Sequence, residues 1–467
     1  MMRAHEAGAV HAEALGRGPS WLLAPADPNV LVESLWPSHV RKSEAGELEV
    51  AGVSVGDLAA EFGTPAYVID EDDFRQRARA FRTAFAGADV YYAGKAFLSL
   101  ATVRWIADEG LSLDVCTGGE LAVALRAGFD PARIGFHGNN KSRDELRRAV
   151  EARVGRVIVD SPTEIERLAE ISAAAGVRQR VLLRVTAGVE AHTHEYIATA
   201  HEDQKFGLSI TEGDAFQAME AITSHQSLDL VGLHSHIGSQ IFDTSAFEVA
   251  ARRVLTLFDR GCRAGMALTE LDLGGGFGIA YTTQDDPATA KQLADGLLAI
   301  VTHECRALGI DVPRLSIEPG RAIAGPSTFT LYEVGTVKKV ALDAGASRLY
   351  VAVDGGMSDN IRTALYDADF SCTLASRRSD TPPLLARVVG KHCESGDIVV
   401  KDEFLPGDVS AGDLIAVPAT GAYCRSLAST YNHVPRAAVV AVRQGQARLV
   451  VRRETEDDLL RLEVDGV

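Results

Sequence analysis

The sequence predicts an α/β protein whose larger part is a (β/α)8 TIM-type barrel, followed by a mostly β, sandwich- or barrel-like C-terminal domain. Two observations predict the barrel: short apolar runs alternate with helical stretches over roughly 250 residues, and polar residues follow many of these runs. A third observation predicts the second domain. After Pro326 the runs are β-like, are separated by Gly, Pro and Asp, and include no long amphipathic helix.

Eight apolar runs are the predicted barrel strands, at Val90–Ala93, Leu111–Val115, Ile134–His137, Val157–Val159, Val181–Val185, Leu230–His234, Leu271–Leu273 and Leu315–Ile317. Helical stretches between them include Leu98–Asp108, Gly119–Ala127, Ser142–Glu151, Pro162–Ala174 and Phe247–Gly265. An open doubly wound sheet would give the same alternation. The barrel is favoured because barrel sites are built where strands end, and polar residues stand at that place after many of these runs.

Changes in this pattern predict the domain boundaries. Residues 1–47 lack periodicity and contain Gly and Pro punctuation, which predicts an extended or partly mobile N-terminal arm. Residues 48–69 include a strand segment that we expect to join the β domain, residues 70–327 form the barrel, and residues 328–467 form the C-terminal β domain. Its β-like runs are Leu331–Val337, Arg348–Val353, Leu385–Val389, Asp413–Val417 and Ala437–Val442.

Composition and charge exclude several classes of function. A formal charge of -17 opposes binding to nucleic acid and to anionic membrane surfaces. No apolar run reaches transmembrane length, and the first residues lack the apolar core of a signal peptide. Six cysteines are too few for a disulfide framework in 467 residues, and no Cys-x-x-Cys pair indicates structural zinc. These features predict a cytoplasmic protein.

Four motifs each follow a predicted strand: Tyr91–Ala96 with Lys95, His234–Ser239, Gly274–Gly278, and Glu318–Arg321. A lysine can form a Schiff base, and an imidazole can stack on an aromatic ring. Glycines let backbone N–H groups approach a phosphate. A carboxylate can keep a pyridine nitrogen protonated, so that the ring accepts electrons. Together these groups predict a site for pyridoxal phosphate.

Each motif alone also has a simpler interpretation. Lys95 could be a solvated strand end, His234 a core histidine, and the glycine run a tight turn. Glu318 could pair with Arg321 in its own turn, although the intervening Pro-Gly should aim the two groups apart. The glycine spacing matches neither a Walker A loop nor a dinucleotide-binding loop.

No metal is expected. His234 and His236 lie two residues apart but have no third ligand at a familiar spacing. The segment 191–195 contains two histidines without a His-Glu-x-x-His pattern, and we interpret residues 191–207 as a polar loop over the barrel mouth. In the β domain, Cys393 beside Glu394 is a weak catalytic indication, because a buried cysteine is usually a small core residue. Gly421–Tyr423 is a loop with an aromatic tip.

The motifs and their order resemble the alanine-racemase-like, fold-III pyridoxal-phosphate decarboxylases, most closely the diaminopimelate decarboxylase family. The resemblance spans about residues 48 to 450 and goes beyond a fold-level analogy. It is carried by Tyr92–Ala96, His234–Gln240, Gly274–Gly278, Glu318–Arg321, Arg362–Tyr366, Cys393–Asp397 and Gly421–Tyr423. Phe97 departs from the pattern, because many relatives have Asn there, and residues 1–47 match no part of it.

The resemblance implies a role for each residue. The catalytic residues are Lys95 as the Schiff-base lysine, His236 stacked on the ring, Glu318 at the pyridine nitrogen and Cys393 as the proton donor. The implied cofactor contacts are Lys95, His236, Ser239, Gly274, Gly275, Gly276, Glu318, Gly320, Arg321 and Tyr423. The implied contacts to the distal end of the substrate are Arg321, Arg362, Tyr366, Glu394 and Tyr423. The resemblance also implies a homodimer, with Cys393 and Glu394 reaching the site of the other subunit.

The implied reaction is decarboxylation of meso-2,6-diaminopimelate to L-lysine and CO2, the last step of lysine biosynthesis. Related ornithine and arginine decarboxylases usually have Asp where this chain has Glu394. Arg321 and Arg362 fit a distal carboxylate, because an arginine left unpaired would cost roughly 2–5 kcal/mol. The alternatives are an arginine, ornithine or carboxynorspermidine decarboxylase, an alanine racemase, which lacks the Cys-Glu segment, and an inactive regulatory homologue, which loses the lysine or the cysteine.

Overall fold

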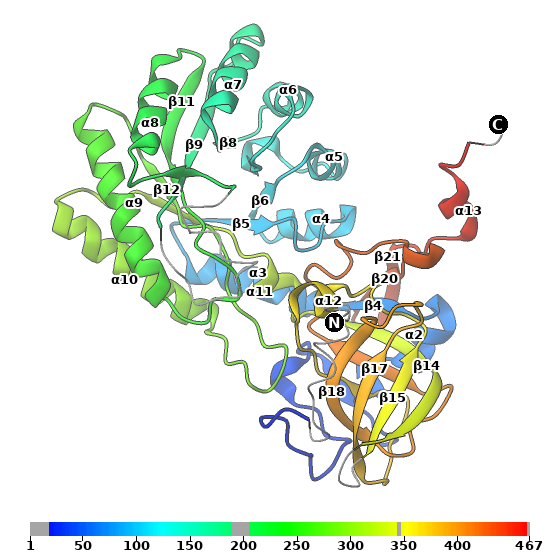
Figure 1. Cartoon of the computed structure of the whole chain (residues 1–467). Coiled ribbons are helices and arrows are strands. Elements are labelled where there is room, and N and C mark those ends of the chain that lie inside the picture. Colours follow the sequence, from blue (N-terminus) through cyan, green and yellow to red (C-terminus); the bar gives the residue numbers. More distant parts are fainter. Residues whose placement is uncertain (1–17, 189–204, 343–346, 465–467) are drawn as a thin grey trace, which may run out of the picture. The chain divides into compact units, whose positions relative to one another are not determined.

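The computed structural model describes residues 18–188, 205–342 and 347–464, and the chain forms two compact units (Figure 1). The barrel unit comprises Arg75–Ile279 and Pro287–Ile323. The β unit combines Met1–Phe74, Ala280–Asp286 and Ala324–Val467.

Eight parallel strands close into a ring in the barrel unit. They are β5 (Asp89–Ala93), β6 (Ser112–Val115), β7 (Ile134–Phe136), β8 (Arg156–Val159), β9 (Gln179–Thr186), β11 (Leu228–His234), β12 (Glu270–Asp272) and β13 (Arg314–Ile317). Each pairs with its neighbours, β8 pairs with β9, and β13 with β5, so the ring has no open edge. The predicted (β/α)8 barrel is confirmed, and each predicted run overlaps one of these strands. A short strand, β10 (Leu208–Ser209), pairs with β9.

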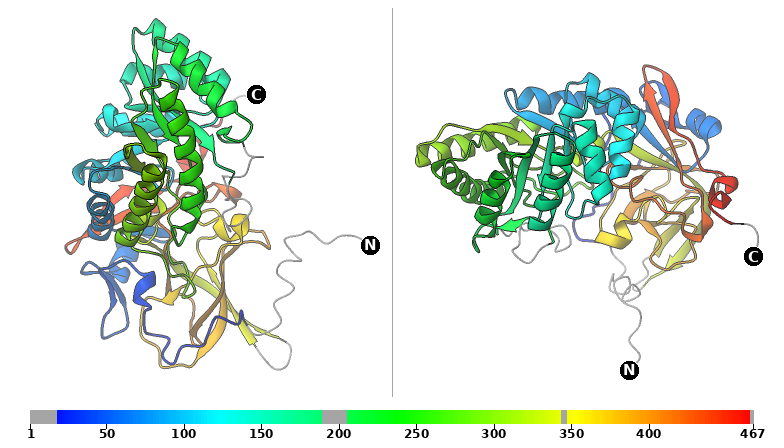
Figure 2. Two further views of the ribbon diagram at one scale, coloured as in Figure 1. Left: turned by 90° about the vertical axis from the view of Figure 1, so that its left-hand side faces the viewer. Right: turned by 90° about the horizontal axis from the view of Figure 1, so that it is seen from above.

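Helices cover the outside of these strands (Figure 2). They are α3 (Glu71–Ala84), α4 (Leu100–Asp108), α5 (Gly118–Arg126), α6 (Arg143–Ala152), α7 (Pro162–Ala174), α8 (Asp214–Ser224), α9 (Ser245–Arg263), α10 (Ala290–Leu308) and the short α11 (Arg321–Ala324). Local sequence determines where several of these helices begin. Ser142 and Glu145 form a reciprocal capping box at the start of α6, and Ser161 caps α7 before Pro162. Because helices cover the strands, β8 is buried throughout, which explains its continuous apolar run.

The β unit is built around one sheet in the order β18-β17-β15-β14-β4-β20-β21, with β19 pairing β14 and β16. The strands are β4 (Ala66–Asp70), β14 (Thr328–Ala341), β15 (Ser347–Val353), β16 (Thr373–Leu374), β17 (Pro383–Val389), β18 (Ile398–Pro406), β19 (Leu414–Pro418), β20 (Ala438–Arg443) and β21 (Gln446–Val451). β4 lies between β14 and β20, far apart in sequence. The mostly β character predicted for this part of the chain is confirmed.

Smaller elements complete the β unit. A separate three-stranded sheet contains β1 (Val40–Lys42), β2 (Leu48–Val50) and β3 (Val53–Ser54). The helical pieces are η1 (Glu33–Leu35), α2 (Val55–Phe62), α12 (Arg362–Tyr366), η5 (Tyr431–His433) and α13 (Glu456–Leu460). No helix in the described ranges is long and apolar enough to cross a membrane.

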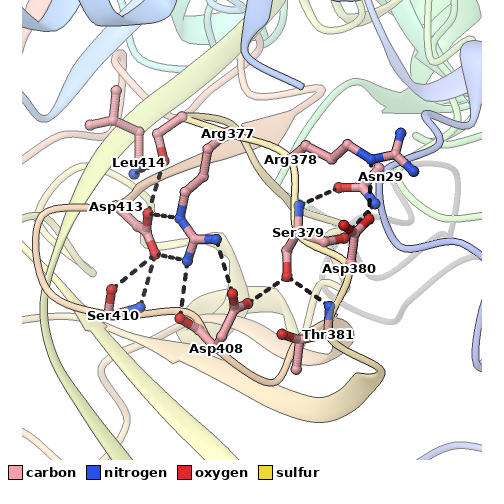
Figure 3. Close-up of polar contacts among 11 residues, drawn as sticks. Asn29, Arg377, Arg378, Ser379, Asp380, Thr381, Asp408, Ser410, Asp413 and Leu414 are labelled. Atoms are coloured by element: carbon pink, nitrogen blue, oxygen red, sulfur yellow. Dashed lines mark hydrogen bonds and ion pairs between the residues drawn. The ribbon is translucent and has the colours of Figure 1, made fainter. Parts of the chain in front are cut away.

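The described part of the predicted N-terminal arm packs on the β unit. Leu35 and Trp36 are buried, and the Trp36 ring lies 6.0 Å from that of Phe329 in β14. Upstream, the Asn29 amide donates to the Ser379 carbonyl at 2.7 Å and accepts from its N–H at 2.9 Å (Figure 3). Residues 29–36 of the predicted arm therefore contact the β unit. The rest of the predicted arm, residues 1–17, lies outside the described residues.

Candidate active site

Lys95 stands in the turn that follows β5. Gly94 N–H donates to the Asp114 carbonyl at 2.9 Å, and a Cβ at Gly94 would lie 2.8 Å from that oxygen, so the turn packs directly against β6. The Tyr92 hydroxyl, buried beneath, donates to the Phe97 carbonyl at 2.7 Å. Lys95 itself is exposed.

A cavity of about 270 Å³ opens at Lys95 in the barrel unit. Polar and charged side chains from the ends of several strands line it: Lys95, Asp114, His137, Arg184, His234, His236 and Glu318. Phe206 also lines it and lies beneath the Arg184 guanidinium, 4.4 Å from carbon to ring centre. Of the predicted loop 191–207, residues 191–204 lie outside the described residues. The structure thus brings three predicted residues, Lys95, His236 and Glu318, to one cavity.

Glu318 follows β13 and is 7% exposed. Its Oε1 lies 2.9 Å from His137 Nε2 and 3.3 Å from His234 Nε2. These are ion-pair distances without hydrogen-bond alignment: among the described residues, Oε1 and both His234 ring nitrogens have no hydrogen-bond partner. In the same turn, a Cβ at Gly320 would lie 2.8 Å from Ala93 Cβ, so this glycine lets the turn pack against β5.

Burial and mutual contact separate the charge states of these groups. Burial alone would raise the pKa of Glu318, but His137 and His234 hold it well below the usual value. Burial opposes a charge on His137, yet Asp114 and Glu318 raise its pKa. Burial lowers the pKa of His234 to about 4, and burial raises that of Asp114 to about 7. At neutral pH the site therefore holds an ionised Glu318 and a neutral His234, and its two carboxylates favour the charged form of His137.

The glycine-rich loop after β12 holds His236. Gly275 N–H donates to His236 Nδ1 at 3.2 Å, which makes Nδ1 the acceptor nitrogen and fixes the tautomer. Burial, with Lys95 as the next cause, keeps the pKa of His236 well below its usual value, so the ring is neutral. Gly274 has φ +71°, and a Cβ there would lie 2.8 Å from His236 Nδ1. Any side chain at Gly274 would therefore displace the imidazole.

The same loop pairs with the segment that carries Ser239. Ile241 N–H donates to the Gly276 carbonyl at 2.9 Å, and Gly278 N–H donates to the Ile241 carbonyl at 2.8 Å. Gly276 has φ +95°, a left-handed conformation that favours glycine. The Ser239 hydroxyl accepts from Arg321 Nη2 at 2.5 Å. Ser239, Gly274–Gly276 and Arg321 thus form one connected group of loops.

In the β unit, three tyrosines surround a buried arginine. The Arg362 guanidinium carbon lies 5.3 Å from the Tyr281 ring centre, 5.5 Å from that of Tyr366 and 5.4 Å from that of Tyr423. Arg362 is 7% exposed, and its Nε has no hydrogen-bond partner in the described part of the chain. Aromatic faces stabilise the cation but leave its in-plane donors available to an anionic ligand. Tyr281 carried no signal in the sequence.

Cys393 and Glu394 lie on an exposed turn of the β unit. The turn is held from beneath: Asp397 accepts the His392 N–H at 2.7 Å, and Asn432 Oδ1 accepts the Cys393 N–H at 3.3 Å. Because the backbone is fixed while both side chains face outward, this turn can present a thiol and a carboxylate to a second molecule.

The comparisons with known proteins agree with this geometry. Residues 71–325 match the family described as pyridoxal-dependent decarboxylase, pyridoxal binding domain. The chain is 58% identical over 440 residues to diaminopimelate decarboxylase of Mycobacterium bovis, covering 93% of this chain and 98% of that protein. It is 56% identical over 473 residues to diaminopimelate decarboxylase of Mycobacterium leprae, covering 99% and 100%.

Solved structures agree as well. The crystal structure of diaminopimelate decarboxylase from M. jannaschii in complex with L-lysine is 29% identical, with a TM-score of 0.85 over 92% of this chain and 98% of that one. The structure of the Helicobacter pylori protein with L-lysine has a TM-score of 0.81 at 30% identity, over 88% and 100%. The chain belongs to the diaminopimelate decarboxylase family. The family membership predicted from the sequence motifs is confirmed.

The barrel residues fit the pyridoxal phosphate that this family uses. A buried carboxylate oxygen without a hydrogen-bond partner among the described residues, on Glu318, suits a polar ring atom. A neutral His236 suits a flat contact, and the loops at Ser239 and Gly276 offer small side chains and backbone amides for a phosphate. The individual contacts remain predictions.

Sequence reasoning missed several cavity residues, among them Asp114, His137 and Arg184. Each is a polar residue in or just after a barrel strand, and that position was the available signal. His234 was weighed in the sequence both as one of a possible metal pair and as a core histidine. Together with His137 and Glu318 it offers ligand atoms within 4.8 Å of one another, as a metal site would. Arg184 in the same cavity opposes a cation, and the expectation of no metal stays a prediction.

Proposed function

We propose that this chain uses pyridoxal phosphate to decarboxylate meso-2,6-diaminopimelate to L-lysine and CO2, the last step of lysine biosynthesis. The observation that carries the proposal is identity of 58% and 56%, over nearly the full length of both proteins, to enzymes named diaminopimelate decarboxylase. These relatives favour this substrate over arginine, ornithine or carboxynorspermidine, and over an inactive homologue.

Bound pyridoxal phosphate supplies an electron sink for the bond that breaks as CO2 leaves. The chain's own residues prepare for this. Lys95 provides the amine that anchors the cofactor, and Glu318 holds a proton at the ring nitrogen because it is kept ionised. His236, which is neutral and whose Nδ1 accepts from the Gly275 N–H, would pack against the ring. Glu318 is buried, and the exclusion of water strengthens its interaction with the ring nitrogen.

The proposed contacts to the distal end of the substrate follow the family resemblance. Arg321 and Arg362, with Tyr366, are proposed to bind the distal carboxylate, and Glu394 the distal ammonium. Cys393 is proposed to return a proton to Cα after CO2 has left. The Nε of Arg362 has no hydrogen-bond partner among the described residues, and Cys393 and Glu394 are exposed. Both observations support these assignments.

We further propose a homodimer with shared sites, in which the turn carrying Cys393 and Glu394 completes the site of the partner subunit. The exposure of this turn in one chain supports the proposal. A cytoplasmic location is also proposed, and the six cysteines, all free, support a reducing compartment.

The function is tested with purified protein, pyridoxal phosphate and a panel of meso-diaminopimelate, L-ornithine, L-arginine and carboxynorspermidine. Release of CO2 and L-lysine from meso-diaminopimelate, with a kcat/KM at least about 100-fold above the others, is the expected result. Preferred turnover of ornithine or arginine would reject the substrate assignment but keep the decarboxylase.

Shared sites are tested by complementation. Lys95→Ala and Cys393→Ala proteins, each inactive, are mixed and allowed to exchange subunits. Random exchange makes about half of the dimers mixed, and each mixed dimer has one intact site, so about a quarter of wild-type activity should return. No activity despite proven exchange would reject the shared site.

A further inference from the structure

His137 stands between two carboxylates. Its Nε2 lies 2.9 Å from Glu318 Oε1 and 3.8 Å from Asp114 Oδ1. The three side chains come from the ends of β7, β13 and β6, and each is at most 10% exposed. One ring nitrogen therefore faces both acids in a place that water hardly reaches, which is the arrangement that favours a charged imidazole.

The surroundings hold His137 in this position. Its backbone N–H donates to the Val115 carbonyl at 2.8 Å. Its ring meets the His234 ring edge-on, with 4.9 Å between the ring centres. The turn after it is fixed by Lys141, a buried lysine that donates to the Gly138 carbonyl at 2.7 Å, the Ile158 carbonyl at 2.8 Å and the Glu164 carboxylate at 2.6 Å. With all three of its donors used, Lys141 stabilises the turn.

We propose that His137 is a positioning residue that, backed by Asp114, keeps Glu318 ionised and so sets how strongly the site holds the ring nitrogen of pyridoxal phosphate. The inference rests on the proposed function, because it concerns the cofactor that function requires. His137 acts through Glu318 and is not assigned a contact with the reacting atoms.

The charged groups around this chain of contacts agree with the proposed role. His137 is faced by Asp114 from β6, by Glu318 just after β13 and by Arg184 from β9, and its ring meets that of His234 from β11. Arg184 opposes a charge on His137, and the two carboxylates outweigh it, so the pKa of His137 rises despite burial. Among the causes that lower the pKa of Glu318, His137 is the largest, ahead of His234.

Two cofactors that differ in one atom test the proposal. Apoprotein is titrated with pyridoxal phosphate and with its 1-deaza analogue, in which CH replaces the ring nitrogen. His137→Gln should weaken the binding of pyridoxal phosphate about tenfold and leave the affinity for the analogue unchanged within about twofold. Asp114→Asn should produce a smaller change in the same direction.

The matched control is His225→Gln, which removes another imidazole of the barrel unit, 3.2 Å from Glu166 at the surface. It should leave both affinities unchanged. If His137→Gln does not fold by circular dichroism, His137→Asn replaces it in the same comparison. Equal weakening of both cofactors would show a merely structural role, and no weakening of either would also overturn the proposal. Failure of the wild-type protein to bind pyridoxal phosphate would instead reject the proposed function.

Discussion

At the amino ends of the barrel strands, Glu270 of β12 accepts hydrogen bonds from Arg156 of β8 at 2.6 and 2.5 Å and from Arg180 of β9 at 2.8 Å. At the carboxyl ends, Glu318 lies beside two histidines, with one oxygen that no described residue hydrogen-bonds. Both glutamates are 7% exposed. The two glutamates are thus equally buried, but only Glu270 has hydrogen-bond donors for both of its carboxylate oxygens among the described residues.

This difference separates stability from function. Two guanidinium groups offset the desolvation of Glu270, so its ion pairs hold strands β8, β9 and β12 together. The carboxylates Asp114, Asp272 and Glu318 share the other end, where burial keeps the pKa of Asp272 well above its usual value. Crowding buried carboxylates in this way costs stability, and a protein retains such a cluster where a ligand or a reaction uses it.

Lys95→Ala should produce the largest effect. Activity should fall by at least about 10³-fold, because the cofactor loses its covalent anchor, while the melting temperature of the apoprotein stays the same. Borohydride reduction of the wild-type holoenzyme should fix the cofactor to Lys95, as read by peptide mass. Lys291→Ala, at an exposed helical position, is the control. Label on a different lysine would contradict the assignment.

Glu318→Gln should slow decarboxylation by about 10²–10³-fold, because a neutral amide does not hold a proton at the ring nitrogen. The cofactor should still bind, with changed absorbance. Turnover and spectra are measured together, with Glu248→Gln at the surface as the control. Wild-type turnover by Glu318→Gln would show that the carboxyl-end acid is not functional.

Glu270→Ala should reduce stability and leave catalysis unchanged, the opposite of the effect of Glu318→Gln. It leaves the buried Arg156 without its partner, so unfolding free energy should fall by about 3–5 kcal/mol while kcat of the folded enzyme is retained. Denaturant unfolding and kcat are compared with Glu248→Ala, which breaks an exposed pair with Arg252 and should cost about 0–1 kcal/mol. A large loss of kcat in folded Glu270→Ala would remove the distinction between the two ends.

Stability of the apoprotein should depend on pH through Asp114. The folded pKa, about 7, lies above the ordinary aspartate pKa of 3.8, so the folded state binds more protons between these values and stability falls as pH rises through this window. Asp114→Asn should therefore reduce this loss by about 1–2 kcal/mol between pH 4 and pH 8. Denaturant midpoints across pH measure it. An unchanged pH dependence would show that Asp114 does not titrate there.

A chelator should have the smallest effect. His137, His234 and Glu318 lie close enough to bind a metal ion, but we expect them to serve the cofactor. Dialysis against EDTA should leave kcat within about 10%, and elemental analysis should find no stoichiometric metal. Loss of activity that zinc or manganese restores would assign a metal to the carboxyl end.

The sequence alone determined the barrel, the β-rich second part and the main motifs. A strand covered by helices must be apolar along its whole length, so the eight runs are visible without the fold. The sequence also placed Lys95, His236 and Glu318 at one end of the barrel, because residues that follow parallel strands meet at the same edge. The burial of Leu35 and Trp36 was not foreseen, because their partners are distant in sequence.

Only the tertiary structure decided how the charges are matched. Asp114, His137 and Glu318 are separated by up to about 200 residues, and nothing in their local sequences indicates that one imidazole nitrogen faces both acids. The pairing of Arg156 with Glu270 across the barrel is equally invisible. Secondary structure depends on neighbouring residues, whereas the charge of a buried group depends on its desolvation and on groups brought from remote segments.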